Sequence, residues 1–312
     1  MVSLIARPSG RDEGRPSPGE CMHHRTRTRL GPALFAGALA VACGHVAPAP
    51  PEQSEERRLA GENGWLLGSD LGLGPSAPVV FMHGVGGDHR LFDSQLREFR
   101  TGRRVLAFDQ RGCGGSADAP DGAYDLDIRV HDLGLVLDAL RLDPVVLVGH
   151  GTGGEVMARY AERNPSRVLG LVIIDPVSGN AEAGRVAKLP ESEFRPAVEA
   201  WLETLLHDAR PETRNQVIAS AQTARVPAMR AMLLDAAGTA LVGSLARYPG
   251  PVLVLAAQAE AIPDALPAGV ETRRLPSGSH WLPLDAPEEV NAALKSFLKP
   301  IDAAALERRR AG

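Results

Sequence analysis

The sequence predicts an α/β fold with a mostly parallel, doubly wound sheet and a helical cap inserted late in the chain. Two observations support this fold class. From about residue 62, short apolar runs alternate with longer amphipathic ones, which is typical of strands followed by helices on both faces of a sheet. From residue 176 to residue 248 the strand pattern is replaced by helical spacing over about seventy residues. Because that is too long for an ordinary connection, we interpret it as a cap over the carboxyl edge of the sheet.

Five apolar runs indicate the strands, and each ends at a turn or a polar segment. They are residues 78–82, 104–108, 145–148, 169–174 and 252–256. Leu and Val recur at helical spacing between residues 125 and 142, and a last helix is expected from about residue 287 to residue 298. Within the cap, helices are expected over residues 194–207 and 229–245.

The composition excludes several classes of protein. The chain has 312 residues, of which 44% are hydrophobic and 23% are charged, as in an ordinary globular domain. Its net charge of −4 shows no basic footprint for a nucleic-acid partner. The three cysteines, Cys21, Cys43 and Cys113, form no zinc-type pair and cannot build a disulfide framework. No metal and no organic cofactor is implied.

Residues 1–42 predict a signal segment. Three arginines between residues 25 and 29 form a positive flank, and thirteen apolar or small residues follow from Leu30 to Ala42. That run is too short to cross a hydrocarbon core of roughly 30 Å as a helix, but it suits the apolar part of a signal. Met22 is an alternative start, because residues 1–21 add nothing to such a signal.

Cys43 directly follows the small residues that end the apolar run. This arrangement resembles the lipobox of bacterial lipoproteins, in which the cysteine is acylated and becomes the mature N-terminus. The resemblance implies a chain held by an N-terminal lipid in the bacterial cell envelope. A plain secretory signal and a short membrane anchor are the alternatives. Residues 43–61 are then the lipidated cysteine and a Pro-rich linker, residues 62–300 the folded domain, and residues 301–312 a C-terminal tail.

Three glycine-rich motifs follow three successive predicted strands. They read His-Gly-Val-Gly-Gly at 83–87, Asp-Gln-Arg-Gly-Cys-Gly-Gly-Ser at 109–116 and Gly-His-Gly-Thr-Gly-Gly at 149–154. Together they resemble the α/β-hydrolase superfamily, whose members carry His-Gly-x-Gly, Asp-x-Arg-Gly-x-Gly-x-Ser and Gly-x-Ser-x-Gly at these places. The resemblance covers about residues 62–300 and implies the α/β-hydrolase fold.

The third motif departs from the family at its centre. The nucleophile of the family is a Ser there, or an Asp or Cys in other branches, whereas this chain has Gly151. The turn needs small neighbours, because its central residue holds a strained backbone, and Gly149, Gly153 and Gly154 meet that need. Gly151 has no side chain, so no acyl or alkyl enzyme can form through it.

The resemblance also implies the other parts of the site. Backbone N–H groups of Val85 and Thr152 are expected to form the oxyanion hole. The side chain of Thr152, the hydroxyl nearest to Gly151, is expected to leave the turn in another direction. The remaining candidates are expected to have structural roles: Cys113, His150, Asp109 and Arg111.

His280 is the expected base, because Ser277-Gly278-Ser279-His280-Trp281 resembles the late histidine loop of the family. The family often places the acid a few residues after the strand that corresponds to 252–256, where this chain has Glu260. Asp175, at the end of the 169–174 strand, is the other position that this fold uses for the acid, and Asp264 is a weaker third choice.

Two hypotheses about function follow. In the first, the chain is an enzyme whose histidine activates water or deprotonates a bound, mostly apolar ester- or carbonyl-bearing molecule. The catalysis of the cofactor-free dioxygenases in this superfamily depends mainly on their histidine. In the second, the chain is a non-catalytic binding protein, like the N-myc downstream-regulated proteins, which also carry glycine at the elbow. Efficient serine-type hydrolysis is not expected, because deleting a triad nucleophile removes on the order of a millionfold in rate.

Overall fold

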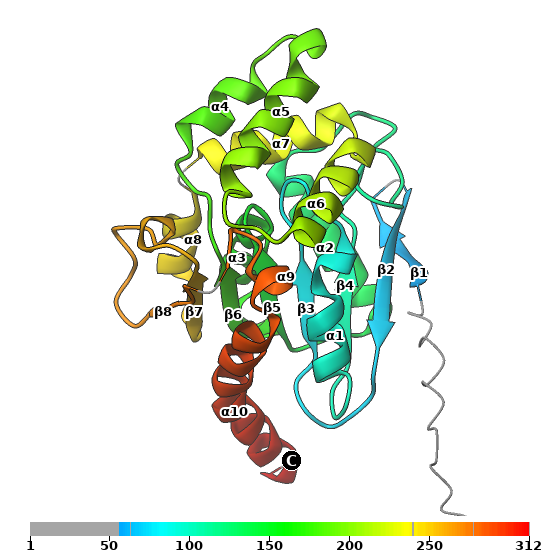
Figure 1. The fold of residues 1–312 in the computed structure, drawn as a ribbon. Coiled ribbons are helices and arrows are strands. Elements are labelled where there is room, and N and C mark those ends of the chain that lie inside the picture. Colours follow the sequence, from blue (N-terminus) through cyan, green and yellow to red (C-terminus); the bar gives the residue numbers. More distant parts are fainter. Residues whose placement is uncertain (1–55, 63, 239, 277, 312) are drawn as a thin grey trace, which may run out of the picture. The chain divides into compact units, whose positions relative to one another are not determined.

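The computed structural model describes residues 56–62, 64–238, 240–276 and 278–311. One sheet of eight strands organises this part of the chain, in the order β1-β2-β4-β3-β5-β6-β7-β8. Strands β1 and β2 pair antiparallel with each other, and β2 pairs antiparallel with β4, whereas all other pairings are parallel. The chain therefore forms the mostly parallel α/β sheet that the sequence predicts (Figure 1).

The five predicted strands all form, with ends within two residues of the expected positions. They are β3 (Val79–Met82), β4 (Val105–Phe108), β5 (Val145–His150), β6 (Val168–Ile174) and β7 (Val252–Ala256). Almost every residue in them is buried, because helices cover both faces of the sheet. The sequence analysis missed the three strands at the edges, β1 (Glu56–Gly61), β2 (Gly64–Leu71) and β8 (Glu271–Arg274). Their more polar sequences lack the continuous apolar run of a buried strand.

Helices lie on both faces of the sheet, as a doubly wound fold requires (Figure 1). One face carries α1 (Asp93–Phe99), the short α9 (Leu282–Asp285) and the long α10 (Pro287–Ala311). The other face carries α2 (Leu126–Leu140), α3 (Gly153–Arg163) and α8 (Ala240–Arg247), which pack on one another. The buried hydrophobic residues accordingly divide into two clusters, one on each side of the strands.

Four helices form the cap between β6 and β7: α4 (Ala181–Ala187), α5 (Glu191–Leu205), α6 (Pro211–Thr223) and α7 (Val226–Ala237). They lie over the carboxyl ends of the parallel strands (Figure 1). The helix expected over residues 229–245 is interrupted near Gly238, so α7 stays in the cap while α8 returns to pack on α3. The cap is therefore shorter at its C-terminal end than the predicted range 176–248.

The two ends of the cap are joined by hydrogen bonds. The N–H of Gly179 and the hydroxyl of Ser178 both donate to the carbonyl of Gly238, at 2.6 and 3.0 Å. The N–H of Asn180 donates to the carbonyl of Ala236 at 2.8 Å. The cap thus leaves and re-enters the body through one narrow stem.

The folded region extends beyond the predicted boundaries at both ends. Residues 56–61 belong to the sheet as β1, although the sequence analysis assigned them to the linker. Helix α10 runs to Ala311 and includes the predicted tail from residue 301. The signal segment, Cys43 and Met22 lie outside the described residues. Within the described ranges no single helix has the length and hydropathy to cross a bilayer. Only α7 and α8 taken together, a pair with a sharp bend between them, have a sufficient length and apolar composition.

Gly153 provides a test of how closely this fold is packed. A Cβ at Gly153 would lie 2.6 Å from the carbonyl oxygen of His83, which belongs to rigid backbone. Gly153→Ala is therefore expected to lower the free energy of unfolding by about 1–3 kcal/mol, as overpacking does. Urea denaturation followed by circular dichroism measures this change.

Gly134→Ala is the matched control. Gly134 lies inside α2, and the nearest atom to its added Cβ is an ordinary contact with the Tyr160 ring at 3.5 Å. Alanine in a helix interior is expected to raise stability by up to about 1 kcal/mol. Equal effects of the two substitutions would contradict the close packing at Gly153.

Candidate active site

A sharp turn joins β5 to α3, and Gly151 is at its centre. The φ angle of Gly151 is +52°, in the left-handed region that L side chains rarely adopt. Its N–H donates to the carbonyl of Ile174 on β6 at 2.9 Å, and its carbonyl accepts from Gly154 at 3.0 Å. This is the geometry of a nucleophile elbow, with glycine where the family has a nucleophilic side chain.

Close backbone packing explains the glycines around the turn. A Cβ at Gly149 would lie 2.6 Å from the backbone of Gly154, and a Cβ at Gly154 would lie 2.9 Å from Ile173. A Cβ at Gly84 would lie 2.9 Å from the nitrogen of Thr152. Strand, helix and the loop after β3 therefore approach one another more closely than any larger residue allows.

Gly151 differs from these neighbours because an added Cβ would meet a side chain and no backbone atom. A Cβ built at Gly151 meets, within 4 Å, only the Nε2 and Cε1 atoms of His280, at 3.3 and 3.6 Å. A side chain at this position would therefore point at the imidazole. The missing side chain leaves Nε2 of His280 facing the space that a nucleophile would occupy.

His280 is held from its other ring nitrogen by a buried carboxylate. Nδ1 of His280 lies 2.6 Å from Oδ2 of Asp175, and Oδ1 of Asp175 accepts from the N–H of Ala257 at 2.6 Å. Both side chains are less than a tenth exposed. Asp175 has a φ of +46°, which is rare for a residue other than glycine. Such strain persists only where the surroundings fix it, and it gathers at functional sites.

The expectation that Glu260 contacts His280 is wrong. Glu260 lies in a one-turn helix, η3 (Ala259–Ala261), and is exposed, whereas Asp175 holds the imidazole. Asp264 is also exposed. The reason is where Asp175 lies in the sheet. It directly follows β6, which pairs with β5, the strand that leads into the elbow. Its own N–H donates to the carbonyl of Leu255 on β7. The alternative that the sequence left open is therefore the acid of the pair.

Val85 and Thr152 are the two residues whose backbone N–H groups are expected to form an oxyanion hole. Val85 lies in the loop after β3, and Gly84 packs against Thr152 in the elbow. Neither backbone N–H donates to a protein acceptor in the part of the chain that the structure describes. The hydroxyl of Thr152 is buried beside Gly84, and a Cβ at Gly84 would lie 3.2 Å from it. Thr152 is thus able to act through its N–H.

His83 braces this loop. The N–H of Gln110 donates to Nε2 of His83 at 3.0 Å, so Nδ1 carries the proton and donates to the carbonyl of Gly84 at 2.9 Å. Burial lowers the pKa of His83 below its usual value and keeps the ring neutral. The oxyanion loop is thereby fixed to the loop after β4.

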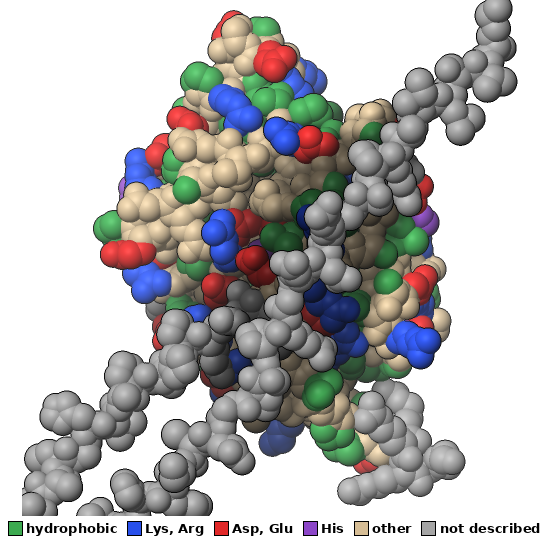
Figure 2. Space-filling model, turned by 90° about the vertical axis from the view of Figure 1, so that its right-hand side faces the viewer, with side chains coloured by type: hydrophobic (Ala, Val, Ile, Leu, Met, Phe, Trp, Pro, Cys, Tyr) green, Lys and Arg blue, Asp and Glu red, His purple; other side chains and the backbone are tan. Residues whose placement is uncertain are grey.

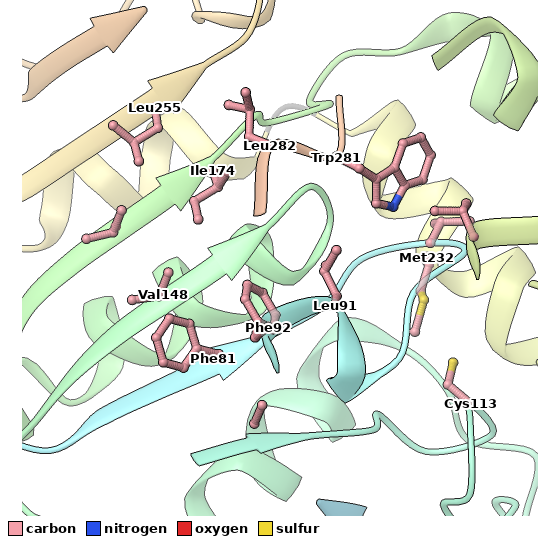
Figure 3. Packing of buried hydrophobic residues seen from close by; sticks show 14 of the residues in the cluster. Phe81, Leu91, Phe92, Cys113, Val148, Ile174, Met232, Leu255, Trp281 and Leu282 are labelled. Carbon is pink, nitrogen blue, oxygen red and sulfur yellow. The ribbon is translucent and has the colours of Figure 1, made fainter. Parts of the chain in front are cut away.

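His150 and Trp281 both pack against the ring of His280. Nε2 of His150 bonds to the carbonyl of His280 at 3.0 Å, and the two rings lie 4.5 Å apart. Burial lowers the pKa of His150 well below its usual value, so the ring stays neutral. The Trp281 ring meets the His280 ring edge-on at 4.8 Å and lies near Met232 of α7 (Figure 3). His280 therefore has little freedom to turn.

The cap is tied to the histidine loop through Asp285, which the sequence analysis did not identify. Its carboxylate accepts from the hydroxyl of Ser279, next to His280, and from the hydroxyl of Thr213 in α6 at 2.6 Å. Leu202 of α5 lies 3.0 Å from a Cβ built at Gly86 in the oxyanion loop. Cap helices thus reach both sides of the site.

The remaining candidates have structural surroundings, as expected. Arg111 forms a buried ion pair with Asp132 of α2 at 2.6 Å. Burial raises the pKa of the Cys113 thiol to about 12, so this buried cysteine does not supply a thiolate. Cys113 lies in the apolar cluster of Figure 3.

One group of described residues has the spacing of metal ligands: Asp88, His89 and Asp109. Their carboxylate oxygens and Nδ1 of His89 already have partners. Asp109 accepts from Nδ1 of His89 at 2.7 Å and from the N–H of Gly115 at 2.8 Å, and Asp88 is paired with Arg90. The group serves as a brace between the first and second glycine-rich loops.

Comparison with known proteins identifies the family. Residues 79–293 match the model of the alpha/beta hydrolase family. The chain belongs to this family. It is 26% identical to the sn-1-specific diacylglycerol lipase ABHD11 of Danio rerio, over 73% of this chain and 80% of that protein. It is 30% identical to a putative carbamate hydrolase, RutD, of Variovorax paradoxus, over 72% of this chain and 92% of that protein.

Solved structures agree on the fold. A putative aryl esterase from Burkholderia cenocepacia superimposes with a TM-score of 0.66 at 20% identity, over 79% of this chain and 98% of that one. An N-acyl homoserine lactone degrading enzyme, Est816, superimposes with a TM-score of 0.64 at 24% identity, over 77% of this chain and 100% of that one. The α/β-hydrolase fold that the sequence predicts is thus confirmed.

One further titratable group lies close to the elbow of this α/β hydrolase. Glu155, four residues after Gly151, is buried, and its Oε1 has no hydrogen-bond partner among the described residues. Burial raises the pKa of Glu155 to about 7, and the nearby carboxylate of Asp235 adds to the rise. Asp235 belongs to α7 and is paired with the buried Arg129 of α2, close to the stem of the cap.

This pKa predicts how stability changes with pH. The raised pKa means that the folded state keeps a proton on Glu155 that the unfolded state loses near pH 4.5. Stability is therefore expected to fall as the pH rises from about 4.5 to about 7, by roughly 3 kcal/mol if no other group compensates. Glu155→Gln should remove this part of the decline and make the protein more stable than wild type at pH 8.

Urea denaturation of both proteins at pH 5 and pH 8 measures the difference. A parallel decline in wild type and Glu155→Gln would assign the pH dependence to other groups. Loss of the far-ultraviolet circular dichroism signal in the variant at pH 5 would show that the carboxyl is needed for folding itself.

Proposed function

We propose that this protein hydrolyses a small, mostly apolar, ester- or carbonyl-bearing molecule with water activated by His280. The observation that carries the proposal is the open position beside Gly151, into which Nε2 of His280 points while Asp175 holds Nδ1. A water molecule at that position would lie where the family has its nucleophilic side chain. The names of the relatives, a lipase and a carbamate hydrolase, favour a carbonyl-bearing substrate.

The residues have distinct roles in this reaction. Nε2 of His280 takes a proton from water while the water oxygen forms a bond to the carbonyl carbon. The carbonyl electron pair moves to its oxygen, which the N–H groups of Val85 and Thr152 stabilise. The intermediate then expels the leaving group, which receives the proton from His280. Asp175 orients the ring and stabilises its protonated form.

The missing nucleophile limits the expected rate. Removal of a triad nucleophile leaves a rate about a thousandfold to ten thousandfold above that in water, from the oxyanion hole and binding alone. A general base typically contributes about a hundredfold to ten thousandfold. We therefore expect slow hydrolysis by the wild type, and we expect His280→Ala to reduce it further.

The second candidate function is ligand binding without chemistry. Gly151 favours it, because the chain forms no acyl enzyme at that position. The strained backbone of Asp175 favours the enzyme, because a binding protein has no need for an oriented imidazole. A screen of wild type against small esters, lactones and carbamates distinguishes the two.

Restoring the nucleophile tests the site directly. In Gly151→Ser the added Cβ would lie 3.3 Å from Nε2 of His280, so the hydroxyl is expected to gain its base. We expect a gain in p-nitrophenyl acetate hydrolysis of at least a hundredfold over wild type, with a burst of p-nitrophenol. A serine at positive φ costs roughly 1–3 kcal/mol, which a domain with ordinary stability of about 5–15 kcal/mol tolerates.

Two double variants serve as controls for this gain. Gly151→Ser with Asp175→Asn should lose most of it, because the imidazole loses the carboxylate that orients it. Gly151→Ser with Glu260→Gln should retain it, because Glu260 is exposed and separate from the ring. A folded Gly151→Ser protein with no gain on any activated ester would favour ligand binding as the function.

We also propose that the chain is a lipoprotein of the bacterial envelope, acylated at Cys43. The positive flank, the short apolar run and the small residues before the cysteine support this proposal. Mass spectrometry of membrane-extracted protein is expected to find diacylglycerol on Cys43 and no residue before it. Cleavage elsewhere, or an intact N-terminus upstream of Met22, would contradict it.

A further inference from the structure

We infer that the edge of the sheet opposite the cap is a docking surface for an anionic lipid bilayer. This docking surface consists of Leu73, the loop at Thr101, and the exposed side of α10 with Lys295, Lys299 and Leu306. The inference rests on the proposed lipid at Cys43 and is independent of the proposed hydrolysis. It assigns an orientation to the protein on the membrane, with the cap facing away.

Leu73 is a large hydrophobic residue on this surface whose side chain is 85% exposed. The backbone of the loop that carries it packs closely against residues 100–103. Gly72 has a φ of +76°, and a Cβ there would lie 2.8 Å from the backbone of Arg100. Ser76 is hydrogen-bonded to Gly102, and Leu73 itself bridges to Thr101. The backbone at Leu73 is thus held in place while its side chain is exposed.

Helix α10 continues the same surface. Thr101 and Leu306 line one groove of about 630 Å³, together with Lys295 and Lys299. The end of α10 projects beyond the sheet (Figure 1), and hydrophobic side chains are visible there on the lower tip of the molecule (Figure 2). Leu306 is 40% exposed. Leu73 and Leu306 therefore flank one continuous face.

The groove on this face has a small excess of positive charge. It is lined by Arg103, Lys295 and Lys299 and by the acidic Glu98 and Asp302, in a chain with a net charge of −4. Lys295 is paired with Glu98 and Arg103 with Asp302, whereas Lys299 has no ion pair among the described residues. Basic residues close to a bilayer of anionic lipid are attracted to its negative surface potential. Exposed leucine beside basic residues is the composition of a membrane-surface contact.

The point at which residues 43–55 join the folded domain indicates that a membrane contacts this surface. Strand β1 runs in the same direction as the parallel strands, so the chain enters it from the side of the docking surface. Glu56 is level with Ser69, about 13 Å before Leu73 along the strand. The thirteen residues from Cys43 to Glu55 reach at most roughly 45 Å. A lipid on Cys43 would hold this face near the bilayer surface.

The three lysines of the chain allow a direct test. Lys295 and Lys299 lie on the docking surface, and exposed Lys188 lies in the cap. Full-length lipidated protein is reconstituted in vesicles of phosphatidylethanolamine and phosphatidylglycerol at three to one, and acetylation rates are measured by mass spectrometry. The acetylation rates of Lys295 and Lys299 are each divided by the rate of Lys188. We expect these ratios to be at least fivefold lower on the anionic vesicles than on vesicles of phosphatidylcholine.

Leu73→Asp should remove this protection while the protein still floats with the vesicles. Leu306→Asp is a second variant with the same expectation. Leu234→Asp is the matched control, because Leu234 is 52% exposed but belongs to α7 of the cap, and it should leave the protection unchanged.

Equal reactivity of all three lysines on the anionic vesicles would overturn the inference. Protection of Lys188 instead would mean that the cap faces the bilayer. Protection that rises with protein concentration at constant lipid would assign the face to a second copy of the chain. Protein that does not float with the vesicles would refute the lipid anchor, and the docking surface with it, without affecting the proposed hydrolysis.

Discussion

The close approach of three backbone segments at the elbow is the constraint on which the site depends. Strand β5, helix α3 and the loop after β3 meet so tightly that glycine is needed at Gly84, Gly149, Gly153 and Gly154. This packing accompanies the left-handed conformation at Gly151 and places Gly84, next to Val85, against Thr152. The same packing is independent of the side chain at residue 151, so the elbow forms although the nucleophile is missing.

His280 and Asp175 complete an arrangement that is costly to maintain without a function. Asp175 holds a rare backbone conformation, and both of its carboxylate oxygens are hydrogen-bonded. His150 and Trp281 pack against the imidazole. Burial lowers the pKa of His150 and of His83, so neither ring adds a positive charge near His280. These features favour retained chemistry at the histidine over simple loss of an ancestral site.

The two ends of the molecule are suited to different tasks. At the carboxyl edge of the sheet, the cap is fastened to the histidine loop through Asp285 and closes through one hydrogen-bonded stem. At the opposite edge, a loop presents the exposed Leu73 and the end of α10 extends beyond the sheet. A tether that enters from this second edge would leave the cap and the site open to the aqueous phase.

The sequence by itself determined the α/β class, the positions of the five central strands along the chain, the glycine at the elbow and the histidine of the site, because apolar runs and glycine-rich turns are local signals. Only the tertiary structure decided the acid. Glu260 and Asp175 both follow strands, and the sequence does not reveal that Asp175 ends β6, beside β5, with its carboxylate directed at the imidazole. The edge strands β1 and β8, the break at Gly238 and the role of Asp285 also depend on contacts between residues far apart in the chain, which no local pattern encodes.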